Sequence, residues 1–103
     1  MPTLNVLHRA EFPGDGYVSL LVRIELLPAE LVAPHTHPGL EMTYVLEGEA
    51  TLSVRGQPDR TLRTGDWFEV PAGTPHSVQN SDRPARALGT YVVEKDKPLT
   101  TWL

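Results

Sequence analysis

Two histidines and a glutamate lie close together in the segment "HTHPGLE". Residues i and i+2 of a strand point to the same face of a sheet, so the imidazoles of His35 and His37 would face one interior. A bend at Pro38 and Gly39 would allow Glu41 to reach the same space. Imidazole nitrogens and carboxylate oxygens are both metal ligands, so this spacing indicates a metal site.

A further histidine, His76, stands in the segment "PAGTPH". If its strand folds back against the first, three imidazoles and one carboxylate converge. Such a set suits a divalent transition ion: manganese, iron, nickel, zinc or copper. An octahedral ion would keep two positions open for water or substrate. A His-x-His pair alone is often no more than two partly exposed polar residues, and His8 is expected at the surface or at a strand edge.

Short strands must position these residues. Ten prolines and eight glycines divide the sequence into short segments rich in Val, Leu, Tyr, Phe and Thr. In "YVSLLVRIELL" apolar and polar residues alternate except at Leu21, which is the pattern of a half-buried strand. No window has a convincing helical period. We expect strands at 17–27, 41–48, 49–56, 66–71, 76–80 and 87–94, forming an all-β sandwich or barrel.

Composition limits the classes of partner. The chain has 103 residues, which fits one domain, and a formal net charge of −4. There is no cluster of Lys and Arg, so nucleic acid and anionic membranes are not expected partners. The sequence has no cysteine, which excludes disulfides and cysteine-based zinc sites. No apolar run is long enough to span a membrane, and no signal peptide is visible, so we expect a cytoplasmic protein.

The spacing of two motifs resembles the cupin superfamily. The positions that carry the resemblance are His35, His37, Glu41 and Gly48 in the first motif and Gly65, Pro71, Gly73, His76 and Asn80 in the second. The segment 49–64 separates the two motifs, a spacing typical of small cupins. The family pattern has a glycine six residues before the first histidine, where this chain has Ala29.

The resemblance implies a single-domain antiparallel jelly-roll β-barrel of six to eight strands over residues 1–103. Its parts would be an N-terminal strand region at about 1–28, a metal-binding core at about 29–94 and a C-terminal tail at 95–103. The ligands of one divalent transition ion per chain would be His35, His37, Glu41 and His76. The other motif residues would be scaffold: Gly48, Gly65 and Gly73 in tight turns, Pro71 stiffening the loop before His76, and Asn80 satisfying backbone groups at a strand end.

Strand parity identifies residues that would line the cavity. They are Thr43, Val45, Phe68, Val70 and Val78. Candidates for the mouth of the barrel or a dimer contact are Tyr17, Arg23, Tyr44, Trp67 and Tyr91. We expect a homodimer, with the apolar segment 4–7 and Trp102 as interface material, because a small barrel has exposed edges to cover. The alternative for Trp102 is packing against the opening of the barrel.

The resemblance implies a metal-dependent enzyme that acts on a small organic substrate. The chemistry would be that of a dioxygenase or of an isomerase-type Lewis acid, with Glu41 as a ligand or as a base. The alternative is a non-catalytic module that binds a small ligand or a metal, since the inward-facing candidates are mostly apolar. A purely structural role is also open, although the presence of all four donors argues against it.

Overall fold

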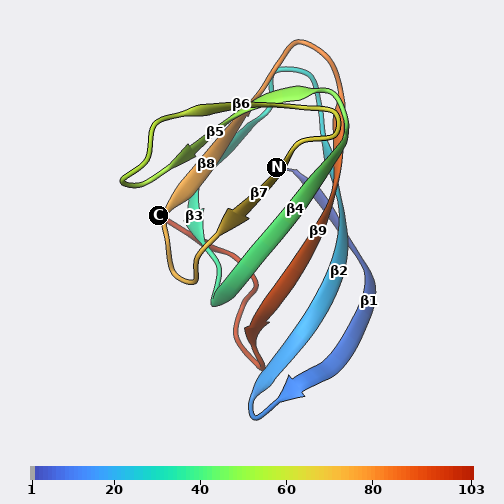
Figure 1. Ribbon diagram of the computed structural model, residues 1–103, viewed down its shortest axis with the longest axis vertical. Coiled ribbons are helices and arrows are strands. Elements are labelled where there is room, and N and C mark those ends of the chain that lie inside the picture. Colours follow the sequence, from blue (N-terminus) through green and yellow to red (C-terminus); the bar gives the residue numbers. More distant parts are fainter. Residues whose placement is uncertain (1) are drawn as a thin grey trace.

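The computed structural model describes residues 2–103 as two antiparallel sheets that face each other (Figure 1). The first sheet has the order β1 (Thr3–Gly14), β2 (Tyr17–Leu26), β9 (Ala85–Glu94), β4 (Gly39–Glu47), β7 (Trp67–Val70). The second has the order β10 (Thr101–Trp102), β3 (Leu31–Thr36), β8 (His76–Asn80), β5 (Glu49–Val54), β6 (Arg60–Arg63). The described residues contain no helix, and so none that could cross a membrane. The expected all-β antiparallel jelly roll is confirmed, as two facing sheets and not as one continuous cylinder of paired strands.

Alternation in the sequence explains which face of each strand is buried. In β2, Val18, Val22 and Leu26 are buried, whereas Tyr17 and Leu21 are exposed. The strands predicted at 41–48 and 49–56 correspond to β4 and β5, but they belong to different sheets. The predicted segments 66–71, 76–80 and 87–94 contain β7, β8 and most of β9. Period-2 patterning therefore identifies six of the ten strands in residues 2–103, without showing which of them pair. The strands outside the expected segments are β1, β3, β6 and β10.

Gly48 is the corner at which the chain passes from one sheet to the other. Its φ is +98°, a conformation that side chains rarely adopt. A Cβ atom built there would lie 2.8 Å from the Cβ of Ala85, so glycine is needed for space as well as for backbone freedom. This corner sends β4 and β5 into facing sheets, and the interior between the sheets is where the candidate site lies.

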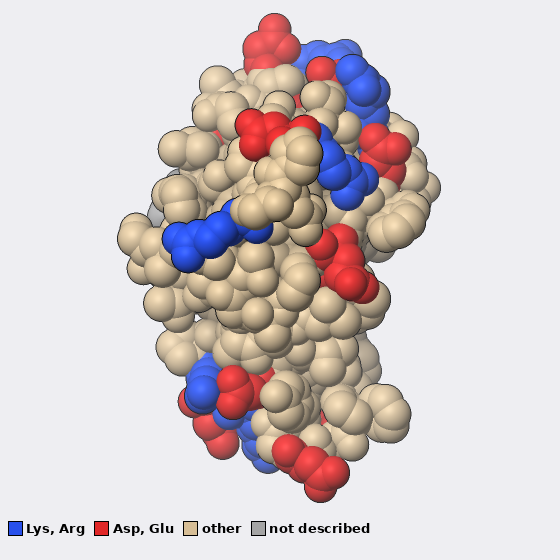
Figure 2. All heavy atoms as spheres, turned by 60° about the vertical axis from the view of Figure 1, so that its left-hand side comes forward, with Lys and Arg blue, Asp and Glu red and all other residues tan. Residues whose placement is uncertain are grey.

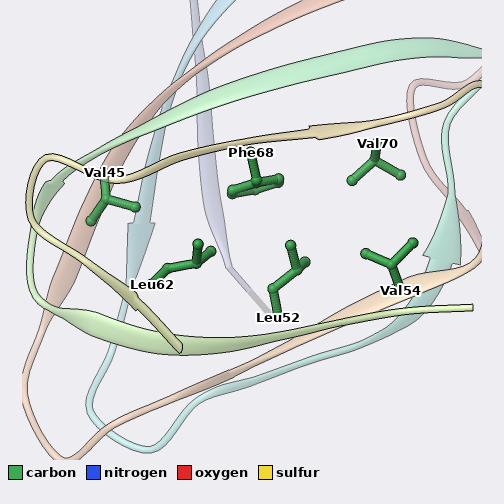
Figure 3. Close-up of a cluster of buried hydrophobic side chains, with 6 residues drawn as sticks. All are labelled: Val45, Leu52, Val54, Leu62, Phe68 and Val70. Carbon is green, nitrogen blue, oxygen red and sulfur yellow. The ribbon is translucent and has the colours of Figure 1, made fainter. Parts of the chain in front are cut away.

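A hydrophobic cluster fills one end of this interior (Figure 3). Its members come from both sheets and are all buried: Val45, Leu52, Val54, Leu62, Phe68 and Val70. Figure 3 shows Val45, Phe68 and Val70 on one side and Leu62, Leu52 and Val54 on the other, with their side chains pointing toward one another. In the strand register Val70 lies opposite Glu41, and Val54 lies opposite His76. The cluster therefore ends where the candidate metal ligands begin.

The turn before β3 holds an alanine in an unfavourable backbone conformation. Ala29 has a φ of +60°, and its backbone N–H donates to the carbonyl of Ser81 at 2.6 Å. This is the position at which the cupin pattern has glycine. Left-handed backbone costs a residue with a Cβ roughly 1–2 kcal/mol. Ala29 thus forms the same kind of turn that a glycine would form, but with a strained backbone.

We predict that Ala29→Gly stabilises the protein. Relief of the left-handed strain outweighs the extra flexibility that glycine gives the unfolded chain, and we expect a net gain of about 0.5–1 kcal/mol in the free energy of unfolding. Chemical denaturation measures it. The control is Ala72→Gly, at an exposed turn position without a positive φ; that change should destabilise the protein. A loss of stability on Ala29→Gly would contradict the prediction.

Candidate metal centre

Strand register brings the four predicted metal ligands together between the sheets. His35 in β3 lies directly opposite His76 in β8. His37 follows the end of β3, and Glu41 lies in β4, directly opposite Tyr91 of β9. All four ligand candidates are buried, with exposed fractions of 4–5%. Residues from both motifs therefore meet at one place, as the sequence predicts.

The bend between His37 and Glu41 depends on a glycine. Gly39 begins β4, and a Cβ atom there would overlap the backbone carbonyl of Val92 in β9. No side chain larger than hydrogen fits while β4 and β9 stay paired. The pair "PG" thus has a second role beside permitting the bend. It lets the backbone of β4 approach β9 closely enough to place Glu41 opposite Tyr91.

Each of the three histidines is held by a backbone carbonyl. Nδ1 of His35 lies 2.7 Å from the carbonyl of Ala33, and Nδ1 of His76 lies 2.9 Å from that of Thr74. Nδ1 of His37 lies 2.7 Å from the carbonyl of Leu99. A carbonyl oxygen can only accept, so each Nδ1 carries the proton and each Nε2 keeps a lone pair. One nitrogen from each ring lies within 4.8 Å of the others.

Glu41 faces two of these lone pairs. Its Oε1 lies 3.2 Å from Nε2 of His37 and 3.3 Å from Nε2 of His76. Both Nε2 atoms are buried and have no hydrogen-bond partner. Lone pairs of nitrogen and carboxylate oxygen repel each other at this distance unless a cation lies between them. A proton or a metal ion must therefore fill this place, and the donor set of imidazole and carboxylate fits a divalent transition ion.

The surroundings shift the pKa values of His35 and Glu41. Burial lowers the pKa of His35 to about 4, with the neighbouring imidazoles adding to the effect, so its ring is neutral at pH 7. Burial alone would raise the pKa of Glu41. Positive charge shared with the facing Nε2 atoms of His37 and His76, and the hydrogen bond from Thr43, outweigh burial and hold the pKa of Glu41 well below the usual range. His35 therefore presents a neutral nitrogen donor, and Glu41 presents a negatively charged oxygen.

Two hydroxyl groups hold the other oxygen of Glu41. Thr43 donates to Oε2 at 2.6 Å, and Tyr91 donates to the same atom at 3.2 Å. Burial raises the pKa of Tyr91, and the charge of Glu41 adds to this, so its hydroxyl stays protonated and remains a donor. With Oε2 occupied, Oε1 is the oxygen turned toward the histidines.

The expected place of Tyr91 at the mouth or at a dimer contact is wrong. Tyr91 is 2% exposed and lies beside His37, with ring centroids 5.0 Å apart. Its space exists because the neighbouring residue on the same face is a glycine. A Cβ atom on Gly89 would lie 2.8 Å from the Tyr91 ring. Tyr91 lies two residues before Val93, which is buried, so the two side chains point to the same face of the strand. This alternation is the feature of the sequence that could have predicted an inward-facing Tyr91.

The other mouth or dimer candidates lie apart from the cavity. All are exposed on strands of the first sheet, and none lines the cavity: Tyr17, Arg23, Tyr44 and Trp67. A role for them at a dimer contact stays a prediction. His8 is exposed in β1, in agreement with its expected surface place.

A cavity of about 90 Å³ adjoins the histidines. Of the five residues predicted to line it, four do so: Thr43, Val45, Phe68 and Val78. Val70 is instead packed in the hydrophobic cluster, with 1% exposure. Ile24, Leu26 and Val32 also line the cavity, so its wall is largely apolar.

The C-terminal tail also contributes to the site, and of the two places expected for Trp102 the structure shows the one at the barrel opening. Besides the carbonyl of Leu99 that holds His37, Thr100 and Trp102 line the cavity. The ring of Trp102 lies 5.2 Å from that of His35, centroid to centroid, and Trp102 is 41% exposed. No motif in residues 95–103 indicates this contact.

The structure places the scaffold residues of the two motifs in turns and at a strand end. Gly65 and Gly73 have positive φ values of 91° and 68°. The backbone N–H of Gly73 donates to the carbonyl of His37 at 3.0 Å, which connects the second motif to the first. The Asn80 side chain donates to the carbonyls of Leu27 and Arg83 at 2.8 and 2.9 Å. The carbonyl of Pro71, in the same loop as Gly73, accepts from the N–H of Thr74 at 3.2 Å.

Residues 22–93 match the family model described as "Cupin domain". The dimethylsulfoniopropionate lyase DddQ of Ruegeria pomeroyi is 41% identical over 71 residues, which are 68% of this chain and 35% of that protein. Germin-like protein subfamily 2 member 2 of Arabidopsis thaliana is 34% identical over 88 residues, 79% of this chain and 40% of that protein. The chain spans less than half the length of these curated relatives.

Solved structures share the fold. The crystal structure of the lyase DddQ from Ruegeria pomeroyi has a TM-score of 0.76 and 27% identity, over 82% of this chain and 42% of that one. An oxalate oxidase in complex with the substrate analogue glycolate has a TM-score of 0.77 and 22% identity, over 99% of this chain and 55% of that one. At that identity the likeness to the oxidase shows the fold alone.

We predict that removing both hydroxyl donors to Glu41 destabilises the metal-free protein. The double variant Thr43→Val with Tyr91→Phe leaves Oε2 of a buried carboxylate without these partners. Hydrogen bonds to charged groups contribute roughly 1.5–3 kcal/mol each, so we expect a loss of at least about 2 kcal/mol in the free energy of unfolding. Tyr44→Phe, at a residue 48% exposed, is the control and should change it by less than about 0.5 kcal/mol. Equal effects in chemical denaturation would contradict this role.

Proposed function

The chain belongs to the cupin family, and from this we propose that it is a metal-dependent cupin acting on a small organic molecule held between its two sheets. One observation carries the proposal. Three buried imidazoles have Nδ1 bound to backbone carbonyls, so their Nε2 lone pairs are left for a cation beside the carboxylate of Glu41. Nε2 of His37 and Nε2 of His76 are buried and have no hydrogen-bond partner among the described residues, and a metal ion would supply the partner that each lacks.

The ligands in this proposal are His35, His37, Glu41 and His76, which would hold one divalent transition ion per chain. The donor set is compatible with manganese, iron, nickel, zinc and copper. When bound, the ion supplies Lewis acidity or, if it is redox-active, reactivity toward oxygen. The protein's own part is to fix the imidazole tautomers, to turn Oε1 of Glu41 inward and to cover the site with apolar side chains.

The reaction class that we propose is that of a dioxygenase or an isomerase-type Lewis acid, with Glu41 as a ligand that can also accept a proton. One relative is named as a lyase, and the likeness to the oxalate oxidase shows the fold alone, so the comparisons do not fix the reaction.

Non-catalytic binding of a small ligand is the second candidate function. The observation that favours it is the scarcity of acid and base groups around the cavity. Apart from the ligand candidates, the charged residues that line it are Glu49 and Arg86. Each is paired with an exposed partner: Glu49 with Arg63 at 3.1 Å and Arg86 with Glu47 at 2.9 Å. Neither is therefore a free acid or base at the centre.

Partners and location complete the proposal. We propose a small-molecule partner and a cytoplasmic homodimer that binds neither nucleic acid nor membrane. On the face drawn in Figure 2, basic and acidic side chains are interspersed and a wide uncharged area lies between them. This face therefore offers no continuous basic surface for nucleic acid. The formal net charge of −4 also disfavours binding to the negatively charged backbone of nucleic acid.

We predict one transition ion per chain and a sharp loss of binding when a histidine ligand is removed. His35→Ala and His76→Ala should each lower metal affinity by more than about 100-fold, because a lost ligand costs more than a lost supporting contact. Glu41→Gln should be milder, since the amide oxygen can still coordinate. Elemental analysis of protein purified without added metal, and titration with zinc or cobalt, measure this.

His8→Ala is the matched control, since His8 is an exposed histidine in β1. Its metal content and affinity should equal those of the wild type. Unchanged stoichiometry in His35→Ala and His76→Ala, or a wild type that takes up no transition ion, would overturn the metal proposal. An oxygen-uptake and product screen of the metal-loaded protein then separates the enzyme from the binding module.

A further inference from the structure

The last residues of the chain are docked against the candidate metal centre. The side chain of Leu99 packs against the buried cluster formed by Val18, Val22, Tyr91 and Val93. Two residues later β10 begins to pair with the edge of β3, and the backbone N–H of Leu103 donates to the carbonyl of Pro34 at 3.0 Å. The segment 98–103 lies beyond the residues matched to the cupin domain. It is anchored on both sides of the cavity residues Thr100 and Trp102.

Trp102 forms part of the cavity wall directly beside a metal-ligand candidate. It lies opposite His35 in the β10–β3 pair, and their ring planes are inclined by 53°. The pairing holds the indole in place from the backbone. Across the cavity the wall continues with apolar side chains from both sheets, among them Ile24, Phe68 and Val78. A ligand bound at the metal would therefore extend along an apolar surface.

The charge at the metal centre determines which chemical group of a ligand would bind there. A divalent ion held by three neutral imidazoles and the carboxylate of Glu41 keeps one positive charge. A monoanionic oxygen donor, such as a carboxylate, would neutralise it. A second charge on the ligand would be buried against the apolar wall, which is costly, because the charged residues that line the cavity, Glu49 and Arg86, are already paired. The ligand's remaining part should therefore be uncharged and apolar.

We propose that Trp102 is the wall of a substrate subsite and that the substrates are small monocarboxylic acids with an apolar substituent. This rests on the proposed metal function and adds to it the class of substrate and a residue that determines specificity. Each methylene buried against such a wall contributes about fourfold in affinity.

The experiment uses cobalt(II)-loaded protein and two probes, acetate and butanoate. Changes in the cobalt absorption spectrum give the dissociation constant of each. The wild type should bind butanoate about 15-fold more tightly than acetate, because the two extra methylenes are buried. Trp102→Ala should reduce this preference to less than about threefold while cobalt still binds. Trp67→Ala, which removes an exposed tryptophan from the first sheet, should keep the wild-type preference.

A second measurement does not depend on the folding of Trp102→Ala. The chain has two tryptophans, so Trp67→Phe leaves Trp102 as the single reporter. Butanoate added to the cobalt-loaded variant should change its fluorescence, and acetate should change it less. Equal preference ratios in wild type and Trp102→Ala, or a Trp102 signal that does not respond to butanoate, would overturn the subsite. A wild type that binds no cobalt would overturn the metal function first, and the subsite with it.

Discussion

Three hydrogen bonds from histidine Nδ1 atoms to backbone carbonyls determine what this site can do. An imidazole that is free to turn would satisfy both of its nitrogens, with Glu41 as the nearest acceptor, and the cluster would close on itself. The carbonyls of Ala33, Thr74 and Leu99 prevent this by accepting from Nδ1. Ala33 and Thr74 each lie two residues before the histidine that they hold, so these two contacts are local. The contact of Leu99 with His37 forms only when the C-terminal segment is in place.

The hydrophobic cluster strengthens the same arrangement from the other side. Val70 and Val54, which lie opposite Glu41 and His76 in the strand register, keep water from that side of the site. In such surroundings the electrostatic interaction between a carboxylate and a cation is stronger than it is in water, but an unpaired carboxylate is also more costly. The hydroxyls of Thr43 and Tyr91 reduce that cost by holding one oxygen of Glu41. Packing and polar contacts thus support one charged group together.

The parts of the site that depend on local spacing could be predicted from the sequence. His35, His37 and Glu41 lie in one short segment, and the second motif places His76 by its own turn residues, so residue types and spacing alone identify the donor set. Tyr91 could not be placed in the same way. An aromatic residue in a strand has no local feature that marks it as a partner of Glu41, and the contact arises from the pairing of β4 with β9. Likewise the contact of Leu99 with His37 joins positions 62 residues apart.

The residues that would determine the chemistry and those that would determine the choice of substrate lie in different parts of the chain. The four donors lie within residues 22–93, which match the cupin domain, whereas Leu99 and Trp102 lie beyond that region. The curated relatives share the matched region but are more than twice as long as the part that aligns. A chain that preserves the donors while its cavity wall comes from elsewhere can keep the same metal chemistry and take a different substrate. For this reason the substrate named for a relative is weaker evidence about this protein than the apolar surface that its own C-terminal residues place beside His35.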